Sequence, residues 1–411
     1  MASAAFSFPA APPAMESRIW RRLPEKLLER VLAFLPPAAF FRARAVCRRW
    51  YALLFSDAFL ELQLRLSPRR RWLLFFQHDL PASFVYSGEP AAAAPPPRHG
   101  LLFDPDEFRW RRLPFDAVVP PDFYPAASSG GLLCWLPLCP GPKPLLLCNP
   151  LSRLALQPPP SLRHRLLPSV GFAVGETSLV VLLAGDDLIS PFAVKNLTAE
   201  RLLIDGLSGR YTPWGAPAAP PPRLCNLPSG RMIFHGGSFF CMSHSPFAVL
   251  SYDIAGDVWK KLQAPMKRFL RSPSLVELAG GVAMVAAVEK RKLAVPRSVR
   301  VWGLKEGGWA EVERMPAAVH EEFAAEERGR GFEAVGEGGT VAITIRGSGA
   351  VLVFELRRRE WRWLPACPLL RNGAACGGGG GLRGFAFEPR LATPALGLLQ
   401  AAPPTPFPFQ G

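Results

Sequence analysis

The feature that most constrains this chain is a segment type that recurs six times at intervals near 50 residues. In each copy an apolar run ends at a polar turn, and the chain re-enters with Trp or another apolar residue shortly before a proline. The gaps are 45, 56, 48, 50 and 52 residues when the equivalent turn positions are Asp104, Asn149, Asp205, Asp253, Gly303 and Glu355. Such a period is typical of repeat architectures, because one repeat cannot bury its apolar face without its neighbours.

The period matches one four-stranded blade of a kelch-type β-propeller, which takes roughly 50 residues. Between the turn segments lie glycine-led apolar runs at 130–136, 230–237, 280–288 and 338–345, which we assign to inner strands of the blades. Six units predict an all-β six-bladed ring, closed by pairing residues 382–390 with strands around 72–76. An array of two-sheet sandwiches is the alternative, and the recurring Trp favours the propeller. The second copy is the weakest, because residues 154–156 replace the Trp.

The N-terminal part has a helical pattern instead. One amphipathic helix is indicated by Leu23, Leu27, Leu28, Val31, Leu32 and Leu35, with Pro24 in its first turn and Pro36 and Pro37 at its end. A second helical run carries Phe41, Ala45, Val46, Trp50, Leu53 and Leu54. A module of about 40 residues buries too little surface to be stable alone. Its apolar face must therefore dock either on the remainder of the chain or on another protein.

The formal charge of +15 is concentrated in two stretches. Residues 18–71 hold 13 basic and 4 acidic residues, a net charge of +9, and residues 267–300 hold 8 basic and 2 acidic residues, a net charge of +6. Basic residues beside strand-like segments can neutralise a row of phosphates. The candidates in the second stretch are Lys267, Arg268, Arg271, Lys290, Arg291, Lys292 and Arg297. The alternative is a solvated basic face without a ligand.

The residue types that carry catalysis are not arranged for it. No two of the eight cysteines have the two-residue gap of a zinc or redox motif, which favours free thiols in a reducing compartment. The six histidines show no metal-ligand spacing, and Asp186 with Asp187 is more typical of a backbone-bonded turn. We therefore expect no catalytic residues, metal or cofactor. No basic residue precedes Arg18 and no run reaches the ~18 apolar residues of a membrane span, so neither secretion nor insertion is expected.

Two motifs near the N-terminus resemble an F-box. They are LPEKLLERVLAFLP at 23–36 and RAVCRRW at 44–50, which give a Leu-Pro start, a helix and a Val-Cys-basic-basic-Trp end. The resemblance implies docking on a Skp-type adaptor, which joins a cullin-RING ubiquitin ligase. It also implies that the adaptor-facing and internal apolar surface is formed by Leu23, Pro24, Leu27, Leu28, Val31, Leu32, Val46 and Trp50.

The whole chain resembles the plant Unusual Floral Organs family of F-box proteins, and in its Ala, Pro and Arg content the grass members of that family. The segments that carry the resemblance include FYPAASSGGLLCW at 123–135, AGDDLISPFAVKNL at 184–197, QAPMKRFLRSPSL at 263–275 and VAAVEKRKLAVPRSVRVW at 285–302. The resemblance implies a partner of the transcription factor Leafy that acts in floral and inflorescence meristems, at promoter DNA as well as in ubiquitin ligation. It implies a nuclear location, with the cytoplasm as an additional one.

These patterns predict a disordered tail at 1–16, an F-box at 17–66, a kelch-type propeller at 67–395 and a flexible tail at 396–411. Two functions remain open. One is the substrate-recognition subunit of an SCF-type ubiquitin ligase, which contributes proximity and no catalytic residue. The other is a DNA-associated transcriptional cofactor that works independently of ubiquitin ligation, with the basic residues of 267–297 facing promoter DNA.

Overall fold

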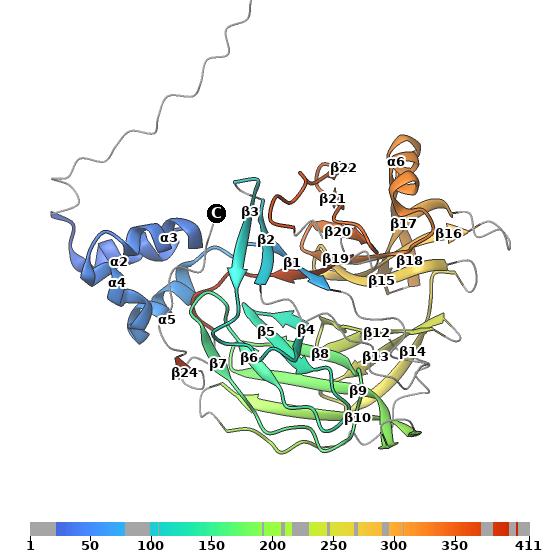
Figure 1. The fold of residues 1–411 in the computed structure, drawn as a ribbon, viewed down its shortest axis with the longest axis horizontal. Helices are drawn as coiled ribbons and strands as arrows, with labels where there is room; N and C mark the ends of the chain where they lie inside the picture. The colour runs from blue at the N-terminus through green and yellow to red at the C-terminus, as the bar shows by residue number, and fades with distance from the viewer. Residues whose placement is uncertain are drawn as a thin grey trace, which may run out of the picture. The chain divides into compact units, whose positions relative to one another are not determined.

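The computed structural model describes residues 22–78, 99–105, 107–190, 193–206, 210–215, 230–244, 247–266, 270–289, 296–306, 308–370, 381–393 and 400–401. The chain divides into two compact units, Met1–Pro68 and Arg69–Gly411. The first is helical and the second is built from β-strands (Figure 1).

The helical unit contains α2 (Glu25–Phe34), α3 (Pro37–Arg44), α4 (Arg48–Ala52), the 3-10 turn η1 (Leu53–Phe55) and α5 (Asp57–Leu66). Pro24 and Pro36 precede α2 and α3, where proline's missing N–H costs no helical hydrogen bond. The second predicted helical run proves to be two helices, because the chain leaves the helix after Arg44. Cys47 then starts α4 by accepting a hydrogen bond at Sγ from the Trp50 N–H, at 3.4 Å.

The second unit is a six-bladed propeller, as the repeat predicts. The sheets follow one another along the chain, and each innermost strand contacts the innermost strands of the two neighbouring sheets. Blade one contains β23 (Gly381–Phe387), β1 (Trp72–His78), β2 (His99–Asp104) and β3 (Arg109–Pro114). Blade two contains β4 (Phe123–Ser129), β5 (Leu132–Pro137), β6 (Leu146–Cys148), β7 (Leu154–Leu156) and β24 (Gln400–Ala401). Strand β24 falls within the predicted C-terminal tail.

The remaining blades follow in order. Blade three contains β8 (Ser169–Val174), β9 (Ser178–Ser190) and β10 (Ala193–Asp205). Blade four contains β11 (Ile233–His235), β12 (Ser238–His244), β13 (Phe247–Asp253) and β14 (Val258–Gln263). Blade five contains β15 (Leu270–Leu278), β16 (Gly281–Glu289), β17 (Pro296–Lys305) and β18 (Gly308–Arg314). Blade six contains β19 (Phe332–Glu337), β20 (Thr340–Ile345), β21 (Val351–Glu355) and β22 (Glu360–Trp363).

The ring closes where the sequence predicts. Strand β23, from the C-terminal part, pairs antiparallel with β1 over seven residue pairs, from Trp72 opposite Phe387 to His78 opposite Gly381. Blade one therefore contains strands from both ends of the unit, and opening the ring requires breaking this ladder. Three of the four glycine-led runs correspond to β5, β16 and β20, the second strands from the axis, and the run at 230–237 contains the innermost strand β11.

Blade three departs from the four-strand pattern. Beyond β10 the described residues return as isolated bridges, with Tyr211 opposite Ile204 and Gly215 opposite Arg201. Pro213 lies between these two bridges and has no N–H to donate, which interrupts a regular fourth strand. The prolines at 217 and 220–222, like the loop at 89–98, lie outside the described residues.

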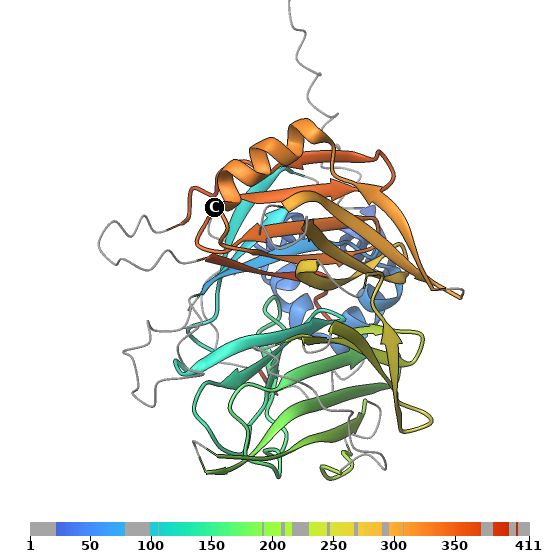
Figure 2. The same cartoon turned by 90° about the vertical axis from the view of Figure 1, so that its right-hand side faces the viewer.

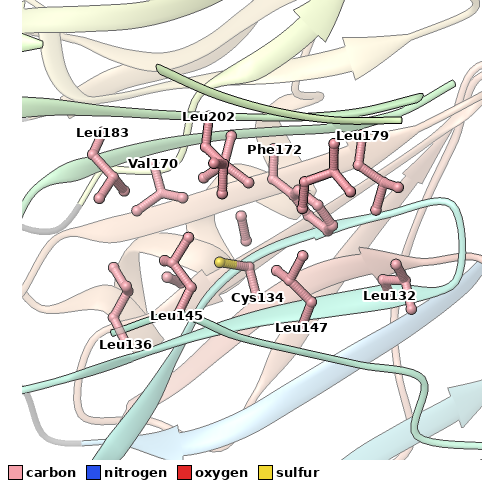
Figure 3. Packing of buried hydrophobic residues seen from close by; sticks show 14 of the residues in the cluster. Leu132, Cys134, Leu136, Leu145, Leu147, Val170, Phe172, Leu179, Leu183 and Leu202 are labelled. Atoms are coloured by element: carbon pink, nitrogen blue, oxygen red, sulfur yellow. The ribbon is translucent and has the colours of Figure 1, made fainter. Parts of the chain in front are cut away.

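The hydrophobic core lies between the blades. Five buried clusters each draw side chains from adjacent blades. In the cluster between blades two and three, Leu132, Cys134, Leu136 and Leu147 face Val170, Phe172, Leu179 and Leu202 (Figure 3). Each sheet is therefore covered on both faces, which explains its nearly continuous apolar runs. Between blades five and six the chain forms α6 (Ala317–Glu327) (Figure 2). Its Phe323 side chain is buried in the cluster between blades five and six.

Three tryptophans of the repeat, in blades one, three and five, each donate a hydrogen bond to the segment that leaves the preceding blade. The indole Nε1 of Trp110 donates to the carbonyl of Pro365 at 2.9 Å, that of Trp214 to Pro159 at 2.8 Å, and that of Trp309 to Gln263 at 2.7 Å. The recurring combination of a Trp and a proline-rich exit thus has a structural reason. One copy supplies the donor and the preceding copy supplies the acceptor.

The Trp309 bond can be tested by substitution. Trp309→Phe should lower the free energy of unfolding by about 1 kcal/mol more than Trp361→Phe, because a net hydrogen bond contributes about that amount. The Trp361 ring packs 4.8 Å from the Phe354 ring, and its indole nitrogen has no hydrogen-bond partner within the described part of the chain. Urea unfolding of both variants measures the difference, and equal losses would show that only ring packing matters.

Arg231 joins three blades across the ring. It lies just before β11 of blade four, and it donates to the carbonyl of Ala334 in blade six at 2.7 Å and to that of Gly384 in blade one. Its guanidinium also lies 5.5 Å from the centre of the Phe385 ring. Burial lowers the pKa of Arg231 to about 10, which leaves the side chain charged at neutral pH. The cation and its carbonyl acceptors therefore fasten opposite sides of the ring together.

Candidate functional site

The helical unit exposes apolar side chains that its own core does not use. On α2, Leu27, Val31 and Phe34 are 47%, 39% and 49% exposed. They lie at i, i+4 and i+7, so they share one face of the helix. Leu28 and Leu32 are buried on the face that packs against α5. Helix α2 thus has one apolar face for its own core and a second without a partner in the described structure.

A second exposed group follows α3. Val46, Tyr51 and Phe55 are all exposed, and the Tyr51 and Phe55 rings lie 6.0 Å apart. Arg44 holds the Tyr51 backbone of this group in place, because its Nε and Nη2 both donate to the Tyr51 carbonyl, at 3.1 and 3.0 Å. Its guanidinium lies 4.4 Å from the centre of the Tyr51 ring. Burial lowers the pKa of Arg44, while its interaction with Tyr51 favours the charged form.

The structure divides the residues predicted to form the adaptor surface. Pro24, Leu27, Val31 and Val46 are exposed; Leu23 and Trp50 are partly buried. Leu28 and Leu32 belong to the core of the unit. Sequence reasoning missed Phe34, Tyr51 and Phe55 as exposed apolar residues. The i+7 spacing from Leu27 was the available signal for Phe34, and the i+4 spacing of Tyr51 and Phe55 was the signal for that pair.

The predicted DNA-facing residues lie mostly outside the described structure. This holds for Lys267, Arg268, Lys290, Arg291 and Lys292. The backbone of Arg297 belongs to β17, and nothing is described of its side chain.

The residues that flank these basic segments lie at one edge of blade five. Leu270, which follows the first segment, pairs with Val288, and Glu289, which precedes the second, pairs with Pro296. The two basic segments, about 20 residues apart in sequence, therefore adjoin the same end of the blade-five strands.

Arg271 differs from the other candidates because its charge is engaged within the propeller. Its Nη2 lies 2.5 Å from Oε1 of Glu327 at the end of α6, and its Nε lies 3.9 Å from Oε1 of Glu289. Glu327 is buried and also accepts from the Gly329 N–H at 2.9 Å. We therefore expect Arg271 to fix α6 against blade five rather than to contact phosphate.

Charged side chains also gather at the C-terminal ends of three innermost strands, β15, β19 and β23. Glu277 belongs to blade five, Glu337 to blade six and Glu388 to blade one. Arg71 and Arg390 lie near Glu337 as well. Glu388 and Arg390 form an ion pair at 2.6 Å. Burial, and then the nearby Glu388 carboxylate, raises the pKa of Glu337 to about 7.

This raised pKa predicts a pH dependence of stability. Between the ordinary glutamate pKa of 4.5 and about 7 the folded protein holds the Glu337 proton more tightly than the unfolded chain, so stability falls as the pH rises through that window. Glu337→Gln should remove this fall and raise the free energy of unfolding by about 1 to 3 kcal/mol at about pH 8, with little change near pH 4.5. Urea unfolding at both pH values measures it; an equal effect at both would contradict the assignment.

The described residues hold no group of three or more His, Cys, Asp or Glu side chains able to ligate a metal. Six cysteines are free thiols: Cys47, Cys134, Cys139, Cys148, Cys241 and Cys367. Within the described part of the chain, no helix is both long and apolar enough to span a membrane.

Comparison with known proteins agrees with this geometry. A family model described as F-box-like matches residues 20–60. The chain is 50% identical over 393 residues to Protein UNUSUAL FLORAL ORGANS of Arabidopsis thaliana, covering 94% of this chain and 88% of the relative. It is 49% identical over 417 residues to Protein ABERRANT PANICLE ORGANIZATION 1 of Oryza sativa subsp. indica, covering 95% and 93%. SKP1-interacting partner 15 of Arabidopsis thaliana is 23% identical over 399 residues, covering 92% and 99%.

The match at the N-terminus falls on the helical unit, and the long matches extend across the propeller. They confirm the resemblance on which the sequence-based expectations depended. The chain belongs to the family of F-box proteins that includes Unusual Floral Organs and Aberrant Panicle Organization 1.

Proposed function

We propose that this protein is the substrate-recognition subunit of an SCF-type ubiquitin ligase and acts with a Leafy-type transcription factor in floral and inflorescence meristems. The observation that carries the first part is the F-box-like unit, whose helix α2 exposes Leu27, Val31 and Phe34. Exposed apolar groups of this kind mark protein interfaces. The name of a relative, SKP1-interacting partner 15, supports a Skp-type adaptor as the occupant.

The protein contributes binding and not bond chemistry in this proposal. The F-box unit binds the adaptor and through it a cullin, the propeller binds the protein partner, and a separate conjugating enzyme transfers ubiquitin. Holding two proteins together raises their effective concentration, which is the form of catalysis available to a subunit without catalytic residues.

The direct test is reconstitution from purified proteins. The full chain, a plant Skp-type adaptor and a cullin should elute together in size-exclusion chromatography, and the assembly should conjugate ubiquitin to the Leafy-type factor. Failure of the chain to bind the adaptor would refute the ligase role.

A second candidate function is a DNA-associated transcriptional cofactor that needs no ubiquitin ligation. The observation that favours it is that the two basic segments adjoin the same end of the blade-five strands, within the stretch 267–300 that carries a net charge of +6. In this function Lys267, Arg268, Lys290, Arg291, Lys292 and Arg297 contact promoter phosphates beside the bound factor. A gel shift with the factor and a promoter fragment tests it, and a complex unaffected by salt would exclude phosphate contacts. Both functions place the protein in the nucleus, with the cytoplasm as an additional location.

A further inference from the structure

A cavity of about 370 Å³ lies between blade six and blade one, on the side of the ring where Glu337 ends its strand. Its lining includes three buried apolar residues, Trp72, Phe103 and Leu364, which we call its floor. Its volume is near the lower end for sites that take small groups, and it suits one or two side chains of an extended peptide.

Three arginines line this groove: Arg71, Arg358 and Arg362. Arg358 is 3.8 Å from the Glu355 carboxylate, so part of its charge is balanced within the wall. Arg71 and Arg362, by contrast, form no ion pair within 4 Å with any residue in the described ranges, although Arg71 lies near enough to Glu337 to favour the charged form of that carboxyl. The Nε of Arg362 is also buried without a hydrogen-bond partner there, while its guanidinium lies 5.1 Å from the centre of the Phe108 ring.

The carboxylates of the groove do not cancel this positive charge. Glu355 is already shared with Arg358. Because the pKa of Glu337 is raised to about 7, much of that carboxyl is neutral near physiological pH. The groove therefore keeps a net positive charge over an apolar floor.

Arg71 is positioned by a glycine that comes 267 residues later in the chain. Gly338 has a φ of +65°, and a Cβ built on it would lie 1.4 Å from Nη1 of Arg71. The guanidinium therefore occupies the space of the missing side chain. Any larger residue at 338 would displace Arg71 and strain the turn.

We propose that the groove between blades six and one binds an extended acidic segment of a partner protein, with its carboxylates on Arg71 and Arg362 and an apolar side chain on the floor. This inference deepens the proposed receptor function and rests on it. Arginine is the cation suited to carboxylates, because its planar guanidinium can donate two parallel hydrogen bonds. A peptide fits better than DNA, because a recessed pocket with an apolar floor admits a side chain but not a duplex.

The test uses the full chain bound to its Skp-type adaptor and a phage-displayed library of random peptides as the probe. Selection on the wild-type complex should enrich peptides that combine Asp or Glu with a large apolar residue. The enriched peptide, labelled with fluorescein, should bind at least about tenfold more weakly to Arg71→Gln with Arg362→Gln, because each lost charged contact costs about that factor. Gly338→Ala should weaken binding in the same direction without removing any charge from the groove.

Arg357→Gln is the matched control, because Arg357 is exposed on the same turn as Arg358 and does not line the cavity. It should bind the peptide like the wild type. The proposal is overturned if selection shows no acidic enrichment, if the Arg71 and Arg362 variant binds equally well, or if Arg357→Gln loses as much. Adaptor binding is measured in parallel. Absence of peptide binding in the groove, with adaptor binding intact, would refute only this inference. Failure of the wild type to bind the adaptor would refute the receptor function.

Discussion

Val31→Glu should reduce binding to the Skp-type adaptor by at least about 100-fold while leaving the protein folded. Val31 is 39% exposed in the middle of the unpartnered face of α2, so the folded chain tolerates a charge there. The complex does not, because an interface that buries the apolar side chain would have to bury an unpaired carboxylate. Removing one large apolar contact costs ~1.5–3 kcal/mol, and the buried charge adds to that cost. Isothermal titration calorimetry with purified adaptor measures the loss.

Two further variants separate binding from folding. Lys26→Glu changes the charge on the same helix at an exposed polar position and should bind the adaptor within a few-fold of the wild type. Leu32→Ala should destabilise the helical unit by about 2–5 kcal/mol, because Leu32 is buried in its core. Leu23→Ala combined with Pro24→Ala should also abolish capture, because it removes apolar contact from the predicted adaptor surface. Unchanged adaptor binding by folded Val31→Glu would show that α2 presents a different face.

The second large effect concerns DNA. Changing Lys290, Arg291 and Lys292 to Ala should weaken the complex with the Leafy-type factor and promoter DNA by about 10- to 1,000-fold at low salt. Each phosphate contact contributes about 0.9 to the slope of log affinity against log salt, so the slope should fall by up to about 3. Adaptor binding should be unchanged, because the substitutions lie outside the F-box unit. Gel shifts over a salt series give both quantities.

The matched control removes the same charge elsewhere on the propeller. Lys260, Lys261 and Lys305 are exposed on strands of blades four and five and belong to neither basic segment. Changing these three to Ala should leave the salt slope within about one contact of the wild type. Equal losses for the two triple variants would indicate a general effect of net charge rather than a phosphate-binding edge.

Much of the propeller follows from spacing. The six turn positions identify the hairpins between the third and fourth strands, because each copy repeats the same polar turn and apolar return. Blade three is the exception, because Pro213 lies between the two bridges that replace its fourth strand. Helix α6 was missed, because its Ala- and Glu-rich sequence falls between two copies of the repeat and belongs to neither pattern.

The candidate sites were predictable only in part. Helical periodicity identified Leu27 and Val31 but could not separate them from Leu28 and Leu32, since both pairs are apolar and the buried face is chosen by α5. Similarly, charge counting included Arg271, whose partner Glu327 lies 56 residues away in sequence. The placement of Arg71 over Gly338 depends on closure of the ring, which brings the first blade beside the last.

In the proposed functions, one chain carries an adaptor surface on its F-box unit and a separate surface for a DNA-bound factor on its propeller. The most direct measurement is a native gel shift of a promoter fragment with the Leafy-type factor, to which the full chain and then the purified adaptor are added. We expect one further shift with each addition, and loss of only the last shift with Val31→Glu. If the adaptor displaced the chain from the complex, or if the chain produced no shift with the factor, the claim would be contradicted.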